Sequence, residues 1–102
     1  MTRGQQGPPA ATYSVFDGMI GEREMGVADW PATQLYQESR SVFGMIVQCD
    51  PDSANGIWVG SATGQWLHLR AGESLTIPIC DPSMIYVEGD GGQATVNWMA
   101  ML

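Results

Sequence analysis

The stretch SLTIPICDPSMIYVEGDGGQATVNWMAM, residues 74–101, carries the pattern that decides the fold. Its apolar and β-branched residues fall into three short runs, at 74–79, 84–88 and 94–101. The first run alternates strictly between apolar and polar residues, which is the period of a strand with one buried face. An Asp-Pro pair follows the first run and a glycine-rich tetrapeptide follows the second, and both are turn signals. The stretch therefore predicts three short strands, and Trp98 falls on the buried face of the last one.

The same pattern continues toward the N-terminus. Strand-like runs at 41–49, 57–59 and 66–69 end at Asp, Pro, Asn or Gly, so a turn signal recurs about every ten residues. Connections this short leave no room for the crossover helices of a parallel α/β fold. We predict an all-β fold, either an antiparallel β-sandwich or a jelly-roll-like barrel. Pro78 has no N–H to donate, which predicts an edge strand at 74–79 or an outward-facing position for Pro78.

The N-terminal part of the chain is less regular. Glycines and a Pro-Pro pair mark residues 1–12 as a flexible arm, either a frayed end or a tether that becomes ordered on a partner. Residues 13–102 are predicted to form a single β-sandwich domain, and 44% hydrophobic residues suffice for one core. Glycines and Pro31 interrupt the pattern between residues 12 and 39. We expect a loop there, with one or two short strands and room for a helical turn at 19–27.

Charged residues are few and mostly acidic. The chain has 11 Asp and Glu residues against 4 arginines and no lysine, for a formal net charge of −7 at pH 7. A nucleic-acid-binding protein needs a basic face to neutralise phosphates, and this composition excludes one. The same lack of basic residues argues against binding to anionic membrane surfaces. No apolar run approaches the roughly 20 residues of a membrane helix. We therefore expect a soluble protein that binds neither nucleic acid nor membranes.

No motif in the sequence marks a catalytic or metal centre. His68 is the single histidine, and no nucleophile stands in a known catalytic signature, so we interpret it as a surface or interface residue. Asp50 and Asp52 fit a turn and lack the spacing of an EF-hand loop. Cys49 and Cys80 are predicted to be reduced, buried residues, although the sequence leaves a disulfide between them open. We predict a non-enzymatic protein with no cofactor and no metal.

Apolar residues in two parts of the sequence predict contact with a partner. Alternation in the run at 66–69 places the two leucines on one face and the aromatic and basic residues on the other, so one face must be exposed or covered by a partner. The chain also ends in Met-Ala-Met-Leu without a polar cap, which leaves apolar surface for docking or oligomerisation. The predicted partner-contact residues, including three that follow the arm, are Tyr13, Val15, Phe16, Trp66, His68 and Arg70.

The order of the sequence pieces between residues 56 and 101 resembles a pattern common among small structural proteins of tailed bacteriophages. The pieces are Ile57-Trp58-Val59-Gly60, Leu67-His68-Leu69, Ala71-Gly72-Glu73-Ser74, the strand at 75–79, Asp81, Ile85-Tyr86-Val87, the turn at 89–92 and Ala94-Thr95-Val96. Within that class the chain looks most like capsid decoration (cement) proteins. The resemblance implies a β-sandwich module on the virion surface, made in the host bacterial cytoplasm. It also implies the major capsid protein as a partner, a homo-oligomer with a trimer favoured, and no catalytic residues.

A second hypothesis fits the aromatic content of the chain. Exposed tryptophans stack on sugar rings, and the candidates are Trp30, Trp58 and Trp66. The alternative function is therefore a receptor- or carbohydrate-binding module of a phage tail or head fibre.

Overall fold

The computed structural model describes residues 18–102, so the predicted arm and the predicted contact residues Tyr13, Val15 and Phe16 lie outside the described range. The described chain contains eight strands, with a short 3-10 helix, η4, between the sixth and the seventh. The elements are β1 (Met19–Val27), β2 (Thr33–Gln34), β3 (Val42–Cys49), β4 (Ile57–Ser61), β5 (Gly64–Leu69), β6 (Ser74–Cys80), η4 (Pro82–Met84), β7 (Tyr86–Gly89) and β8 (Ala94–Met101). No helix in this range has the length and apolar character that crossing a membrane requires.

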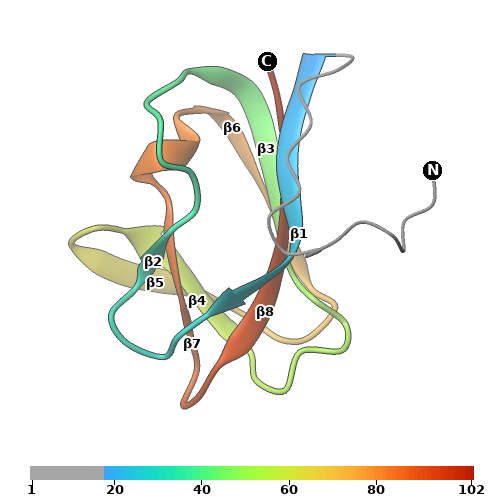
Figure 1. Cartoon of the computed structure of the whole chain (residues 1–102), viewed down its shortest axis with the longest axis vertical. Helices are drawn as coiled ribbons and strands as arrows, with labels where there is room; N and C mark the ends of the chain where they lie inside the picture. The colour runs from blue at the N-terminus through green and yellow to red at the C-terminus, as the bar shows by residue number, and fades with distance from the viewer. Residues whose placement is uncertain (1–17) are drawn as a thin grey trace.

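The strands pair as one long hairpin that has been rolled up. β1 pairs with β8, β2 with β7, β3 with β6 and β4 with β5, and every pair is antiparallel. Rolling adds the pairs β3–β8 and β4–β7. The result is two four-stranded sheets, sheet A in the order β1-β8-β3-β6 and sheet B in the order β2-β7-β4-β5 (Figure 1). This double-sheet arrangement is a jelly roll, and the predicted all-β antiparallel sandwich is confirmed.

The core lies between the two sheets, where alternate residues of each strand face inward. In β8 every second residue from Ala94 is buried, and Trp98 is only 3% exposed, as the alternation predicts. The Trp98 ring makes an edge contact with Tyr36, with 5.6 Å between ring centroids. Burying an aliphatic or aromatic side chain stabilises the fold by about 1.5–3 kcal/mol. The buried hydrophobic residues are Ile20, Val27, Leu35, Val42, Met45, Val47, Cys49, Ile57, Val59, Leu69, Val87, Ala94, Val96, Trp98 and Ala100.

The prediction for residues 19–27 is wrong, because this segment is the nine-residue strand β1 and contains no helical turn. Gly21 lies so close to β8 that a Cβ there would be 2.5 Å from the carbonyl oxygen of Trp98. Glu24, with φ of 56°, lies in a bulge where the register with β8 shifts. The glycine and the bulge that broke the sequence pattern are therefore features of tight strand pairing, not of a loop.

The edge position predicted for residues 74–79 is confirmed, since β6 is the last strand of sheet A. Cys49 N–H donates to Glu73 O at 3.0 Å, which fixes the hydrogen-bonding phase of β6 against β3. Counting from Glu73 along β6, the odd-numbered residues direct their backbone N–H and C=O groups toward β3, and the even-numbered residues direct theirs away from the sheet. Pro78 is therefore at an outward position, where its missing N–H leaves no gap in the sheet.

Candidate interaction surface

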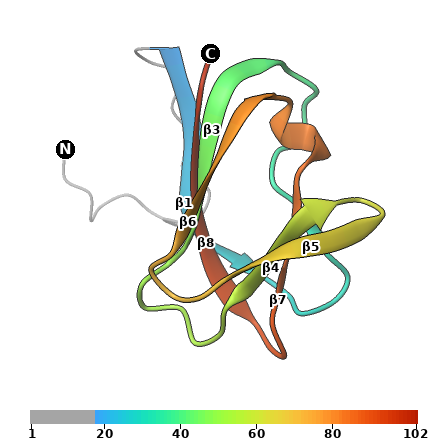
Figure 2. The same ribbon diagram turned by 180° about the vertical axis from the view of Figure 1, so that it is seen from behind.

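The predicted contact residues that the structure describes lie on or next to β5, which forms a hairpin with β4. Figures 1 and 2 show this hairpin projecting sideways from the body of the sandwich. Leu69, at the base, is buried in the core, whereas Leu67 is 51% exposed and Trp66 is 65% exposed. The strand thus begins in the core and continues past its end. Both apolar side chains of the outer half are left without the second sheet that covers the base.

Trp66 lies at a β-bulge. The residues on either side of it pair with two consecutive residues of β4, because Leu67 is opposite Val59 and Gln65 is opposite Gly60. Trp66 is consequently an extra residue with no partner on β4. A bulge interrupts the alternation of side chains along a strand. The predicted shared face of Trp66, His68 and Arg70 therefore does not hold at Trp66.

The bulge brings Trp66 to the side of the hairpin that carries Leu67. On β4, Val59 and Ser61 share a face, and their partners Leu67 and Gly64 share the same face of β5. A Cβ on Gly64 would come within 2.8 Å of the Trp66 ring, so this ring lies over Gly64. Trp66 and Leu67 together form an exposed apolar pair, which we call the hairpin patch.

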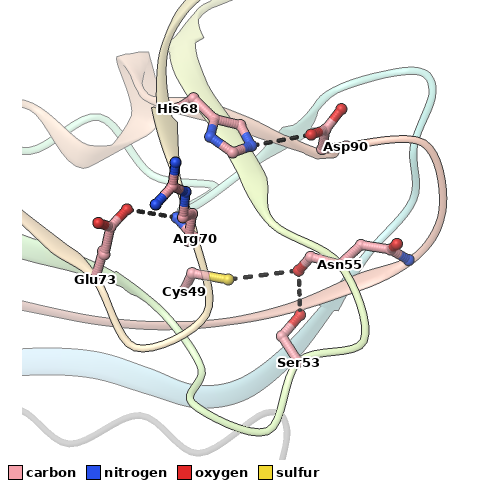
Figure 3. Close-up of polar contacts among 7 residues, drawn as sticks. All are labelled: Cys49, Ser53, Asn55, His68, Arg70, Glu73 and Asp90. Atoms are coloured by element: carbon pink, nitrogen blue, oxygen red, sulfur yellow. Dashed lines mark hydrogen bonds and ion pairs between the residues drawn. The ribbon is translucent and has the colours of Figure 1, made fainter.

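His68 occupies the opposite side of the hairpin and is held there by two contacts. Its Nε2 lies 2.9 Å from Oδ2 of Asp90 (Figure 3). Its ring is 4.9 Å from the ring of Trp58. Gly56 makes room for the imidazole, because a Cβ at that position would be 2.9 Å from Nε2. Sequence reasoning missed the roles of Trp58 and Asp90. Trp58 follows from the register of β4 and β5, but no sequence signal places the turn that carries Asp90 beside His68.

Arg70 follows the end of β5 and belongs to a tight turn. Its N–H donates to Oε1 of Glu73 at 2.7 Å, and the N–H of Glu73 donates to the carbonyl of Arg70 at 2.9 Å (Figure 3). The Glu73 carboxylate therefore binds the backbone of Arg70. Within residues 18–102 the guanidinium has no ion pair, because the one ion pair there joins His68 and Asp90. Arg70 is exposed and remains available to an acidic group on a partner.

Cys49 belongs to a hydrogen-bonded group beneath the loop that joins β3 to β4. Its Sγ donates to the carbonyl of Asn55 at 3.5 Å, and Ser53 Oγ donates to the same oxygen at 2.6 Å (Figure 3). Ser53 Oγ also accepts from the N–H of Thr95 at 2.9 Å. Burial raises the pKa of the Cys49 thiol, which keeps it protonated and unreactive. The prediction of a buried, structural thiol is confirmed for Cys49.

The two cysteines are both free, which settles the question that the sequence left open. Cys80 is half-buried at the end of β6, and burial raises the pKa of its thiol as well. The prediction of a buried residue is therefore only partly confirmed for Cys80.

A second exposed apolar surface covers part of the outer face of sheet A. Ile46 of β3 lies opposite Met99 of β8, and they are 40% and 42% exposed. Met101, opposite Gly44, is 52% exposed. The methionines fit the predicted apolar surplus at the C-terminus. The exposure of Ile46 was not predicted. Residues 42–47 are apolar almost without interruption, so their sequence does not reveal which face of the strand is outside.

The described residues offer little that could perform chemistry. No hydroxyl or thiol within residues 18–102 hydrogen-bonds to His68, and both Ser53 and Cys49 donate to Asn55. The same part of the chain contains no group of three or more His, Cys, Asp or Glu residues arranged to hold a metal ion. A hollow of about 430 Å³ beside the start of β8 is lined by backbone and small side chains such as Ala28 and Ala54, with no titratable residue among its described lining.

Comparisons of the chain with protein-family models, with curated proteins and with solved structures found no match.

Proposed function

We propose that this chain is a non-enzymatic capsid decoration (cement) protein of a tailed bacteriophage. In this role it binds the major capsid protein on the assembled head and stabilises contacts between capsid subunits. The eight-stranded jelly roll supports the proposal, because this architecture recurs in viral capsid domains. The sequence resemblance of residues 56–101 to decoration proteins supports it independently.

The hairpin patch is the observation that carries the proposal. Trp66 and Leu67 are large, adjacent and exposed on a projecting hairpin, and Arg70 lies at the base, where its guanidinium has no ion pair with any of residues 18–102. Tryptophan and arginine dominate the energetics of protein interfaces, because they combine a large contact area with a polar or charged group. A projecting hairpin of this kind can enter a depression between capsid subunits. Many copies on a symmetric shell then gain avidity, although each single contact is weak.

Binding to preformed heads tests the proposal. The purified chain is mixed with expanded heads assembled from the major capsid protein of the phage that encodes it, and occupancy is measured by co-sedimentation. We expect saturable binding at micromolar concentration, and occupied heads that withstand higher temperature and lower ionic strength than bare heads. Absence of binding at these concentrations, or equal stability of bare and occupied heads, contradicts the proposal.

A matched pair of variants locates the contact. Trp66→Ala removes the larger half of the hairpin patch and is expected to weaken attachment about tenfold or more. Trp30→Ala removes a tryptophan that is 78% exposed and outside the hairpin, and it is expected to leave occupancy unchanged. Equal loss in both variants shows that aromatic surface in general, and not the hairpin, attaches the chain.

The alternative, a receptor- or carbohydrate-binding module of a tail or head fibre, is supported by the exposed rings of Trp66 and Trp30 and by the use of jelly rolls in lectins. Trp58 is a weaker candidate, because it is half-buried and packs against His68. Titration with a glycan panel, followed by tryptophan fluorescence, tests this function. A saturable response that disappears in Trp66→Ala supports it, and no response to any glycan excludes it.

A further inference from the structure

Two rows of uncharged positions cross the four strands of sheet A, and their large exposed apolar residues are Ile46, Met99 and Met101. The cross-strand register places Met19, Met101, Gly44 and Pro78 side by side in the first row. The second row consists of Gly21, Met99, Ile46 and Thr76. None of the eight positions is charged, although the chain carries a net charge of −7. We call these two rows the sheet A patch.

The sheet A patch ends at a polar row. Asn97 lies opposite Gln48 and donates from Nδ2 to the Gln48 side chain and to Oδ2 of Asp50, each at 3.0 Å. Its Oδ1 accepts the N–H of Glu24 at 2.8 Å. These side-chain groups are already hydrogen-bonded within the chain. An apolar surface with a satisfied polar border is the usual composition of a protein–protein contact.

We propose that the sheet A patch pairs with the same patch of a second copy, face to face, across a two-fold axis that runs along the strands between β8 and β3. This axis places each residue of β8 over the residue of β3 in the same row of the other copy. Met101 then lies over Gly44 of the second copy, and Met99 lies over Ile46 of the second copy. The same contacts occur twice, as an isologous interface requires.

The shape of the patch suits this arrangement. Met101, a long and flexible side chain, meets a glycine that has no side chain of its own. Gly44 itself is buried, and among the described residues outside its chain neighbours a Cβ there would contact only the carbonyl oxygen of Ile77, at 3.6 Å. Met99 and Ile46 form the second contact, and methionine adapts to such surfaces readily. Aligned sheets pack about 10 Å apart, which two layers of these side chains fill.

Charge restricts the faces at which a second copy can approach. Two chains that each carry a net charge of −7 repel one another over most of their surfaces. The sheet A patch brings no carboxylate of its own into the contact, so self-association there avoids the repulsion of directly opposed like charges.

The open sheet edges are protected against pairing with another strand. β1 has a bulge next to Glu22 and Arg23, β2 has only two residues, and β5 has the bulge at Trp66. β6 is interrupted by Pro78 at an outward position. Bulges, charges, short strands and proline are the devices that block edge-to-edge association. Contact through the face of sheet A, and not through an edge, is therefore the expected mode.

The patch is small, which sets the expected strength. Two rows across four strands cover much less than the roughly 800 Å² per partner of a standard interface, so we expect only a weak dimer, with a Kd of about 10 μM to 1 mM. The full chain is examined by sedimentation equilibrium across this range, without capsid protein. Because no capsid protein is present, a failure to dimerise is distinguishable from a failure to bind heads. We expect a dimer at the upper concentrations, whereas a monomer throughout, or a trimer, overturns the proposal.

Two glutamate substitutions locate the contact. Met99→Glu places a carboxylate in the patch and is expected to raise Kd at least about tenfold. Met84→Glu is the control, because Met84 is 63% exposed on η4, outside the patch, and is expected to leave Kd unchanged. Dimerisation of Met99→Glu at wild-type strength overturns the proposal. Circular dichroism verifies folding, and Ile46→Glu serves as a second variant if Met99→Glu does not fold.

Deletion of residues 1–17 identifies a competing occupant. If the full chain dimerises and the deleted chain does so with equal or greater strength, the second copy is the occupant. If only the deleted chain dimerises, the N-terminal segment occupies the patch in the full chain, and the proposal is overturned.

Discussion

The hairpin patch and the sheet A patch are both exposed and apolar, but they are exposed for different reasons. Trp66 and Leu67 belong to a strand that extends beyond the second sheet, so they lack the cover that Leu69 receives at the base. Met99 and Ile46 lie in the centre of a complete sheet, on strands whose inner faces are fully buried. The outer half of the hairpin buries little of its apolar surface, whereas the sheet A patch has the core directly behind it. We therefore expect the hairpin to adjust its conformation when it binds a partner, and sheet A to bind as a rigid surface.

The largest effect is expected when a core side chain behind the sheet A patch is removed. Trp98 lies on the buried face of β8, next to the exposed Met99, and Trp98→Ala is expected to reduce the free energy of unfolding by about 3–5 kcal/mol. Trp66→Ala changes a tryptophan of similar size on the hairpin and is expected to cost less than about 0.5 kcal/mol. Urea denaturation followed by circular dichroism measures both. Similar losses in the two variants would show that the hairpin contributes to the core.

A second test concerns the contact of β1 with β8, which fixes one side of the sheet A patch. Gly21→Ala introduces a Cβ 2.5 Å from a backbone oxygen, and the two strands must separate to accept it. We expect a loss of about 1–3 kcal/mol, measured by thermal or urea unfolding. Gly26→Ala is the matched control on the same strand, since a Cβ there meets no described atom within 4 Å and Gly26 lacks a positive φ. If the control loses as much stability as Gly21→Ala, strand propensity and not the close approach explains the glycine.

The smallest effect is expected at Asp81, where the chain leaves sheet A for sheet B. Hydrogen bonds from Ser39 Oγ, Arg40 N–H and Ser83 hold the pKa of Asp81 well below its ordinary value of 3.8. A carboxyl whose pKa is lowered by folding stabilises the fold in its ionised form. Its contribution is therefore complete well above pH 3.8 and decreases as the pH falls below that value.

Asp81→Asn is accordingly expected to lower the Tm at neutral pH, with a difference from the wild type that narrows as the pH falls below 3.8. Thermal unfolding across this range measures the difference. Asp52→Asn changes an exposed carboxyl in another turn and is the control, with no change of Tm expected at neutral pH. A Tm difference for Asp81→Asn that stays constant with pH would show that charge at this position is unimportant.

The sequence predicted the C-terminal half of the fold better than the N-terminal third. Strands β6 and β8 follow from local alternation, and the edge position of β6 follows from Pro78, because each depends on neighbouring residues alone. Strand β1 was not predicted. Its glycine and its bulge are explained only by β8, a strand more than 65 positions away along the chain.

The candidate surfaces were predicted in part. Alternation indicated exposed residues in β5 and at the C-terminus, but the bulge moved Trp66 to the side of Leu67 and away from His68. The pairing of His68 with Asp90 joins strand β5 to the turn after β7 and depends on the register of three strands. No spacing in the sequence encodes that juxtaposition.

By itself the sequence determined the fold class, the acidic and lysine-free surface, and the alternation that buries Trp98. These follow from composition and from a period of two residues. Only the tertiary structure decided the rolled hairpin topology, the continuous uncharged rows of sheet A and the grouping of Trp66 with Leu67. Each depends on which strands become neighbours and in what register, and that is fixed by the packing of the whole core.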